Sequence, residues 1–244
     1  MRYSIVIKQL FIIAKSKWAL SFFQGNVFSL ASFEVISNLK KMVPNLNYIL
    51  DVGANSGQFS KAAIAFYPEA KIDAFEPLPN LFPKTAKKFK NSKNINIHNL
   101  ALGNENGKIK FNQNEYEHIS SILEINSENI HYPKQLITSP QIEVEIKTLD
   151  SFLADKELPP LTLLKLDVQG YEMEVLKGAT KAVEKIDYII LEANLEQLYI
   201  NQPSFTEMNN YLTGIGFELQ GMLDFNLGFK NKYIEIDLLF KKKK

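Results

Sequence analysis

The sequence predicts an α/β fold built on a doubly wound, mostly parallel sheet with helices on both faces. Short apolar runs alternate with stretches of helical spacing over most of the chain. The runs are apolar throughout, as in parallel strands buried on both faces. Two of them end in glycine-containing turns, at 51–57 and 167–170. In such sheets, ligands bind beyond the carboxyl ends of the strands, so these turns are the first candidates for a site.

Length, charge and cysteine content narrow the function. The 244 residues suit one α/β domain with an N-terminal extension. The sequence contains no cysteine, which excludes thiol catalysis, thiolate metal sites and disulfides within it and fits a reducing compartment, so we expect a cytoplasmic protein. A net charge of +1 gives no support for a nucleic-acid partner.

Residues 1–43 form the expected N-terminal helical extension, and 44–244 the main domain. The apolar run 5–13 is interrupted by Lys8 and is too short to span a bilayer. No small-residue cleavage site follows it. We expect a helix packed on the domain; the alternative is a helix lying on a membrane surface.

The first half of the domain alternates strand and helix. Residues 48–52 are an apolar run after the break at Pro44 and Asn45, as a buried strand should be. Helical spacing over 58–67 stops at Pro68. The order then continues with a strand at 71–75, a helix at 80–90 and a strand at 95–100.

The second half repeats this order after an insertion. Strand candidates 108–112 and 142–147 flank the polar segment 113–140, which is long for a plain connection and typical of a binding loop or lid. Glycines at 214 and 216 mark a helix end. The remaining elements are strands at 161–167 and 187–192, helices at 171–183 and 205–213, and a closing antiparallel strand pair at 217–222 and 233–240.

The turn at 51–57 has the character of a nucleoside site. Gly53 and Gly57 permit a sharp turn and a close backbone approach to a ligand, and Asp51 can orient a ligand amine. The spacing departs from the Gly-x-Gly-x-x-Gly dinucleotide fingerprint, and no phosphate-binding Lys-Ser or Lys-Thr pair follows. S-adenosylmethionine (SAM) carries no phosphate, so this shallow turn fits it.

Glu76 ends the second strand, 25 residues after Asp51. A carboxylate at this position can accept both ribose hydroxyls of a nucleoside. Pro77 holds the following turn rigid. Because an acid at this position also occurs in NAD enzymes, Glu76 indicates a nucleoside more than SAM in particular.

The strand at 161–167 ends in a second turn of the same design. Asp167 should point into the crevice, and Gly170 permits the turn. Glu172 lies in the first helical turn, where it either caps the helix or contacts substrate. Lys165 either points away from Asp167 or pairs with a neighbouring acid.

Four segments together resemble the FkbM family of methyltransferases over roughly 47–240. The segment Tyr48-Ile-Leu-Asp-Val-Gly-Ala-Asn-Ser-Gly-Gln-Phe-Ser60 is similar to the opening motif of the family, and Phe75-Glu-Pro77 to its second motif. Asn99-Leu-Ala-Leu-Gly103 resembles the third motif, and Leu164-Lys-Leu-Asp-Val-Gln-Gly-Tyr-Glu172 the fourth. Many family members have Glu where this chain has Gln169.

The resemblance implies a class I, Rossmann-like SAM-dependent methyltransferase that O-methylates a small-molecule or glycan hydroxyl, on a sugar or a secondary metabolite. It also implies the residue roles. The SAM-binding residues would be Asp51, Gly53, Asn55 and Gly57 in the loop, Glu76 with Pro77 at the ribose, Ala101 or Leu102 at the adenine, and Asp167 near the methyl group.

An alcohol is a poor nucleophile, so a general base is expected. Asp167 is the first candidate, as base or orienter, and His98 the second; His118 and His131 are further candidates. The expected substrate contacts are Ser120, Ser121, Glu172 and Glu192. Asp167, Glu192 and Asn194 also carry the hard oxygen atoms that bind Mg²⁺, but Glu192 can equally orient substrate, and we expect no metal.

Three rival functions remain at this stage. A Rossmann oxidoreductase or another nucleotide enzyme would share Glu76, although the glycine spacing disfavours it. A nucleic-acid methyltransferase is disfavoured by the charge and by the absence of an Asn-Pro-Pro-aromatic run. A non-catalytic SAM-binding or assembly protein would keep the same cofactor motifs.

Overall fold

The structure, a computed structural model, describes residues 29–128, 140–227 and 233–243. A seven-stranded sheet forms its centre, in the order β3-β2-β1-β7-β8-β10-β9. β10 runs antiparallel to β8 and β9, and the other pairs are parallel. The strands are β1 Tyr48–Val52, β2 Lys71–Phe75, β3 Ile95–His98, β7 Thr162–Leu166, β8 Tyr188–Asn194, β9 Phe217–Leu227 and β10 Tyr233–Lys242. The predicted doubly wound sheet with an antiparallel C-terminal pair is confirmed.

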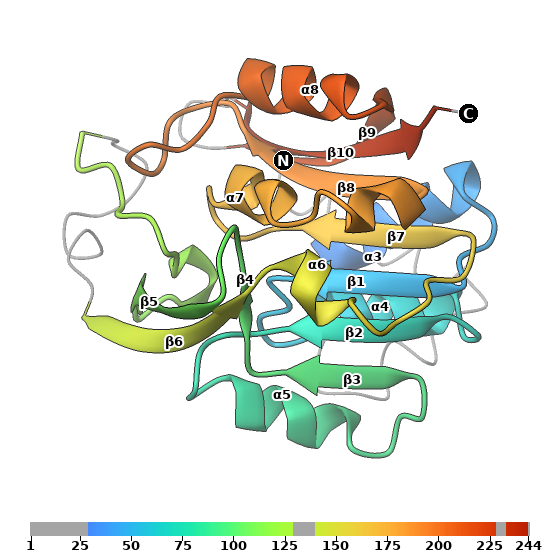
Figure 1. Cartoon of the computed structure of the whole chain (residues 1–244), viewed down its shortest axis with the longest axis horizontal. Coiled ribbons are helices and arrows are strands. Elements are labelled where there is room, and N and C mark those ends of the chain that lie inside the picture. Colours follow the sequence, from blue (N-terminus) through green and yellow to red (C-terminus); the bar gives the residue numbers. More distant parts are fainter. Residues whose placement is uncertain (1–28, 129–139, 228–232, 244) are drawn as a thin grey trace, which may run out of the picture.

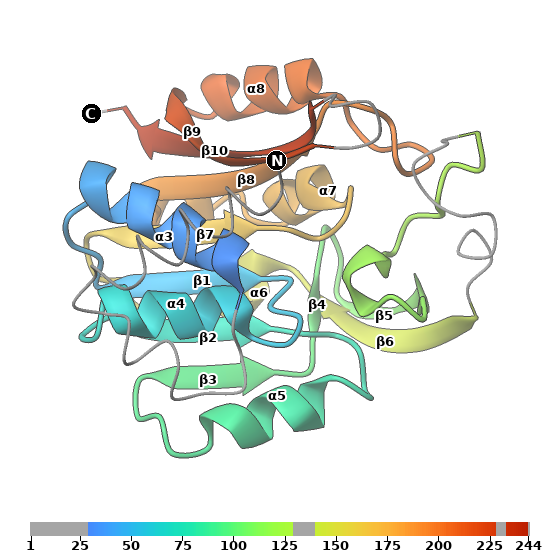
Figure 2. The ribbon, with the colours of Figure 1, turned by 180° about the vertical axis from the view of Figure 1, so that it is seen from behind.

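Helices cover both faces of the sheet (Figures 1 and 2). α3 Leu30–Met42 and α4 Gln58–Phe66 lie on one face, and α6 Leu149–Phe152 and α7 Glu172–Lys177 on the other. The other helices of the described residues are α5 Phe82–Phe89, α8 Phe205–Gly214 and the 3₁₀ turns η1 Glu117–Ile119 and η3 Ala182–Lys185. Two buried apolar clusters, one per face, hold the layers together.

A second, small sheet lies beyond the carboxyl ends of the central strands (Figure 1). It contains β4 Ala101–Leu102, β5 Gly107–Asn112 and β6 Gln141–Lys147, in the order β4-β6-β5. The expected strand at 95–100 is therefore wrong in its extent. β3 ends at His98, and the chain crosses to the small sheet, where Ala101 pairs with Ile146.

The expected helix at 171–183 is also shorter than predicted, since α7 ends at Lys177. The cause is a close contact between two backbones. A Cβ atom on Gly178 would lie 1.9 Å from the carbonyl oxygen of Gly103, so only glycine fits there. The helix stops where it meets the turn after β4.

The described part of the N-terminal extension packs on the domain. Ser29 is the N-cap of α3, and its hydroxyl accepts a hydrogen bond from the Ser32 amide at 3.2 Å. It buries Phe33, Ile36 and Leu39 in the core beside α4. Residues 1–28, including the apolar run 5–13, lie outside the described residues. Across the described ranges, no helix is both long enough and apolar enough to cross a bilayer.

Candidate active site

A cavity of about 400 Å³ opens at the carboxyl ends of β1, β2 and β7, on both sides of the point where the strand order reverses. This is the switch point at which doubly wound sheets bind ligands. Nine predicted site residues line it: Gly53, Asn55, Glu76, Pro77, Ala101, Leu102, Ser120, Asp167 and Glu192. His118 and Gln169 line it as well.

The glycine turn after β1 is shaped by its contact with the turn after β7. Gly53 has a φ of +84°, and a Cβ atom there would lie 1.8 Å from the Asp167 carbonyl oxygen. Asn55 also takes a left-handed φ, at 50°, and lines the cavity. Gly57 is the N-cap of α4 and packs against Phe89 instead. Gly57 therefore shapes the loop without lining the cavity.

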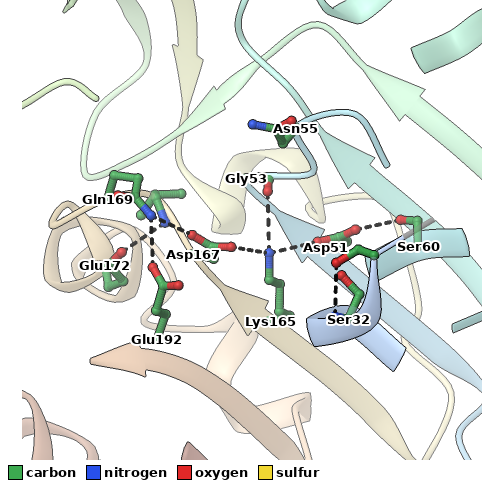
Figure 3. Close-up of polar contacts among 12 residues, drawn as sticks. Ser32, Asp51, Gly53, Asn55, Ser60, Lys165, Asp167, Gln169, Glu172 and Glu192 are labelled. Atoms are coloured by element: carbon green, nitrogen blue, oxygen red, sulfur yellow. Dashed lines mark hydrogen bonds and ion pairs between the residues drawn. The ribbon is translucent and has the colours of Figure 1, made fainter. Parts of the chain in front are cut away.

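Beneath this turn, Lys165 is buried between two carboxylates (Figure 3). Its Nζ lies 2.9 Å from Asp167 Oδ2 and 3.4 Å from Asp51 Oδ1. Asp51 and Lys165 are register partners on β1 and β7, so their side chains share one face. Asp51 also accepts a hydrogen bond from the Ser60 hydroxyl at 2.5 Å. Asp51 therefore supports the turn from below and does not line the cavity.

Gln169 joins the carboxylates of Asp167 and Glu192 (Figure 3). Its Nε2 donates to Asp167 Oδ1 at 3.0 Å and to Glu192 Oε2 at 2.9 Å. Its Oε1 accepts from the Tyr199 hydroxyl at 2.8 Å. The residue has a φ of 57°, a conformation that costs energy for a side chain other than glycine. The amide therefore holds both cavity carboxyls in fixed positions.

The pKa values of Asp167 and Glu192 are shifted in opposite directions. Burial would raise the pKa of Asp167, but the Lys165 ammonium and hydrogen bonds from Glu192 and Lys165 outweigh it and hold the pKa below its ordinary value. Burial, followed by the nearby Asp167 charge, raises the pKa of Glu192 well above its ordinary value. Of these two neighbouring carboxyl groups, Asp167 is therefore the stronger acid and Glu192 the weaker.

Glu76 is the acid at the end of β2, and it is buried against the glycine turn. Its Oε1 accepts the Leu78 amide at 2.8 Å, and the Asn55 amide also donates to the carboxylate. Burial raises the pKa of Glu76 to about 7, and those two backbone hydrogen bonds limit the rise. Pro77, Ala101 and Leu102 supply apolar cavity wall next to this acid.

Several predicted site residues lie elsewhere. His98, a candidate base, does not line the cavity; its Nε2 lies 2.8 Å from Asp73 Oδ1, and its ring stacks on Phe75. Ser121 donates its hydroxyl to the Gln169 carbonyl at 2.7 Å, so it fixes the loop and is not on the cavity wall. His131 lies outside the described residues.

Glu172 stabilises the turn after β7 through hydrogen bonds to the backbone. Its Oε1 accepts the backbone amides of Val168 at 2.9 Å and Gly170 at 3.2 Å, and the side chain is buried outside the cavity. The carboxyl thus fixes the turn after β7, which is neither the helix cap nor the substrate contact that its position suggested. We leave it out of the substrate contacts.

Burial of Glu172 predicts a pH-dependent stability. Burial raises its pKa from 4.5 to about 7. A raised folded-state pKa gives stability that is present below pH 4.5 and is lost as the pH rises to 7. Glu172→Gln keeps the accepting oxygen and cannot ionise. We expect the variant to gain roughly 2–3 kcal/mol over the wild type in urea unfolding at pH 8, and little at pH 4.5. A gain that is equal at both pH values would contradict this assignment.

The sequence did not settle the contacts of three polar residues near the site: Lys165, Gln169 and Tyr199. Strand alternation puts residues 165 and 167 on one face, so the option in which Lys165 points away from Asp167 is wrong and the ion-pair option is confirmed. Gln169 and Tyr199 meet only because the 198–202 segment packs against 117–126, as in the Ile125–Tyr199 bridge. No sequence signal indicated that contact.

Metal ligation finds no support among the candidate ligands. Asp167 and Glu192 are already joined by Gln169. Asn194, the third candidate, does not line the cavity. Within the described ranges, no group of three or more His, Asp or Glu side chains is arranged to hold an ion.

A doubly wound sheet, a glycine turn without a dinucleotide fingerprint and a strand-end acid around one switch-point cavity define a class I methyltransferase. The chain belongs to the FkbM methyltransferase family: the methyltransferase FkbM domain matches residues 51–219. The resemblance drawn from the four sequence motifs is thereby confirmed, and with it the assignment as an enzyme.

Two curated relatives are similar over much of the chain. The 2-O-methyltransferase NoeI of Sinorhizobium fredii is 26% identical over 176 residues, covering 69% of this chain and 71% of the relative. The hexuronic acid methyltransferase AglP of Haloferax volcanii is 27% identical over 162 residues, covering 65% of this chain and 61% of the relative. The solved magnesium protoporphyrin IX methyltransferase of Synechocystis, with bound SAM, aligns at a TM-score of 0.47 and 11% identity, over 88% and 81% of the two chains.

Proposed function

We propose that this protein is a SAM-dependent O-methyltransferase that acts on a hydroxyl of a sugar or a secondary metabolite. The observation that carries the proposal is the switch-point cavity, which has the glycine turn and the Glu76 carboxyl on its wall. The names of the relatives support the acceptor class, because one is a 2-O-methyltransferase and the other a hexuronic acid methyltransferase.

The cavity fits SAM in size and in chemistry. Its volume of about 400 Å³ lies within the ordinary range for small-molecule sites. Glu76 offers a carboxylate to ribose hydroxyls, and Pro77, Ala101 and Leu102 offer apolar surface to an adenine. The turn Gly53 to Asn55 brings backbone close to the amino-acid part. When bound, SAM supplies an electrophilic methyl group on a sulfonium.

The residues around Asp167 would position the acceptor. A carboxylate with a lowered pKa is a weak base, so we assign Asp167 to orient the acceptor hydroxyl through a hydrogen bond. His118 lines the same cavity, and imidazole is the commonest general base in enzymes. We assign His118 to take the hydroxyl proton. Ser120 and Glu192, on the same wall, would contact the acceptor.

A turnover assay tests this proposal. Purified protein is incubated with SAM and simple hydroxyl acceptors, such as methyl glycosides and small phenols, and release of S-adenosylhomocysteine (SAH) is measured with and without EDTA. We expect turnover of at least one acceptor and no effect of EDTA. Protein that binds SAM but turns over no hydroxyl acceptor would favour the non-catalytic alternative, and activity lost on chelation would contradict the metal-free assignment.

A further inference from the structure

One wall of the cavity is acidic, and it is built from strands of the C-terminal half. Glu192 on β8 and Glu235 on β10 both line the cavity beside Asp167. Asp237 is the register partner of Glu192 on β8 and of Asp224 on β9, so carboxyl groups stand opposite one another across three strands. Like charges directly opposite in a sheet are destabilising. The strand pairing by itself therefore does not explain this row.

The described residues that line the cavity include no lysine and no arginine. Lys165 lies behind the wall, where it pairs with both Asp167 and Asp51. Burial raises the pKa of Asp237 to about 7, and repulsion from the nearby Asp167 charge adds to the rise. An anion brought to this wall would meet the same repulsion.

We propose that the acceptor of this methyltransferase is a donor-rich hydroxyl compound that carries no carboxylate, phosphate or sulfate group. This inference rests on the proposed function and narrows its substrate class to uncharged or cationic hydroxyl compounds, which separates this chain from its hexuronic acid methyltransferase relative. The carboxyl groups of Glu192 and Glu235 accept hydrogen bonds from hydroxyl or amino groups of such a compound. An anionic acceptor of the same shape is rejected by charge.

The test uses three probes on one ring: methyl glucoside, its 2-amino derivative and the corresponding methyl glucuronide. Each is titrated into SAH-loaded, nitrogen-15-labelled protein, and the side-chain amide signals of Gln169 and Asn226 are followed by NMR. We expect the glucoside and the amino derivative to shift both signals. The glucuronide should need a concentration at least about tenfold higher than the glucoside for the same shift. This difference should become smaller at high salt.

Two variants of equal charge sharpen the comparison. Glu235→Gln removes one carboxyl charge from the wall and should reduce the difference between the concentrations of glucuronide and glucoside that give the same shift. Glu184→Gln changes an exposed residue outside the cavity and should leave this concentration difference unchanged. Glucuronide binding equal to that of the glucoside would overturn the inference. If none of the three probes shifted the NMR signals of protein that binds SAH, the inference would also be overturned. Protein that binds neither SAM nor SAH would instead contradict the proposed function.

Discussion

Replacing Lys165 with methionine is expected to destabilise the protein by about 3–5 kcal/mol. The ammonium is buried and lies within 3.4 Å of two carboxylates, Asp51 and Asp167. Methionine keeps the length of the side chain but leaves two buried carboxylates without the cation that balances their charge. Urea unfolding at pH 7 measures the loss.

Lys156→Met is the matched control. Its ammonium also pairs with a buried acid, Asp73, at 3.1 Å, but the lysine side chain is 40% exposed. Exposed ion pairs contribute about 0–1 kcal/mol, so this variant should lose little. Adding Asp51→Asn to Lys165→Met should recover part of the stability, because it removes one of the unpaired charges. If Lys165→Met and Lys156→Met were equally stable, the buried ion pair would not support the site.

Asp167→Asn is expected to lower kcat by about a hundredfold, the cost of losing the group that orients the acceptor, while SAM affinity changes by less than about tenfold. Asparagine keeps the shape but has only one accepting oxygen, so it can accept a hydrogen bond from Lys165 or from Gln169 but not from both. It loses the charge that draws the hydrogen of the acceptor hydroxyl. The variant is compared with the wild type in SAH release under saturating acceptor, and SAM binding is measured separately.

Asp155→Asn removes one charge from an exposed loop residue and serves as the control for net charge. Its kcat should match that of the wild type. Full activity of Asp167→Asn together with unchanged SAM affinity would show that Asp167 has no part in the reaction. A loss confined to SAM affinity would assign Asp167 to the cofactor alone.

The parts of this site that lie within one strand and the turn after it could be predicted from sequence. β1 with Gly53, β2 with Glu76 and β7 with Asp167 each show an apolar run followed by a polar or glycine-rich turn. The switch-point rule then brings the three ends together without further information. The local pattern and the global fold agree at these positions.

The parts that depend on contacts between distant segments could not be predicted. His98 was a candidate base within the predicted strand 95–100, but its ring turns to Asp73, a pairing set by the register of β2 and β3. The acidic row of Glu192, Asp237 and Asp224 exists only because β10 inserts between β8 and β9. Strand order beyond the parallel core leaves little trace in a single sequence.

The central claim is that SAM binds in the switch-point cavity with its ribose on Glu76. Calorimetric titration of SAM and SAH at pH 8 into the wild type, Glu76→Gln and Glu76→Ala tests it most directly, since the pKa of about 7 leaves the wild-type carboxyl ionised there. We predict micromolar binding to the wild type and an affinity at least about a hundredfold lower for Glu76→Ala. Glu76→Gln, which keeps an oxygen for the Leu78 amide, should fall between them. Absence of SAM and SAH binding to the wild type, or equal binding to all three proteins, would contradict the account.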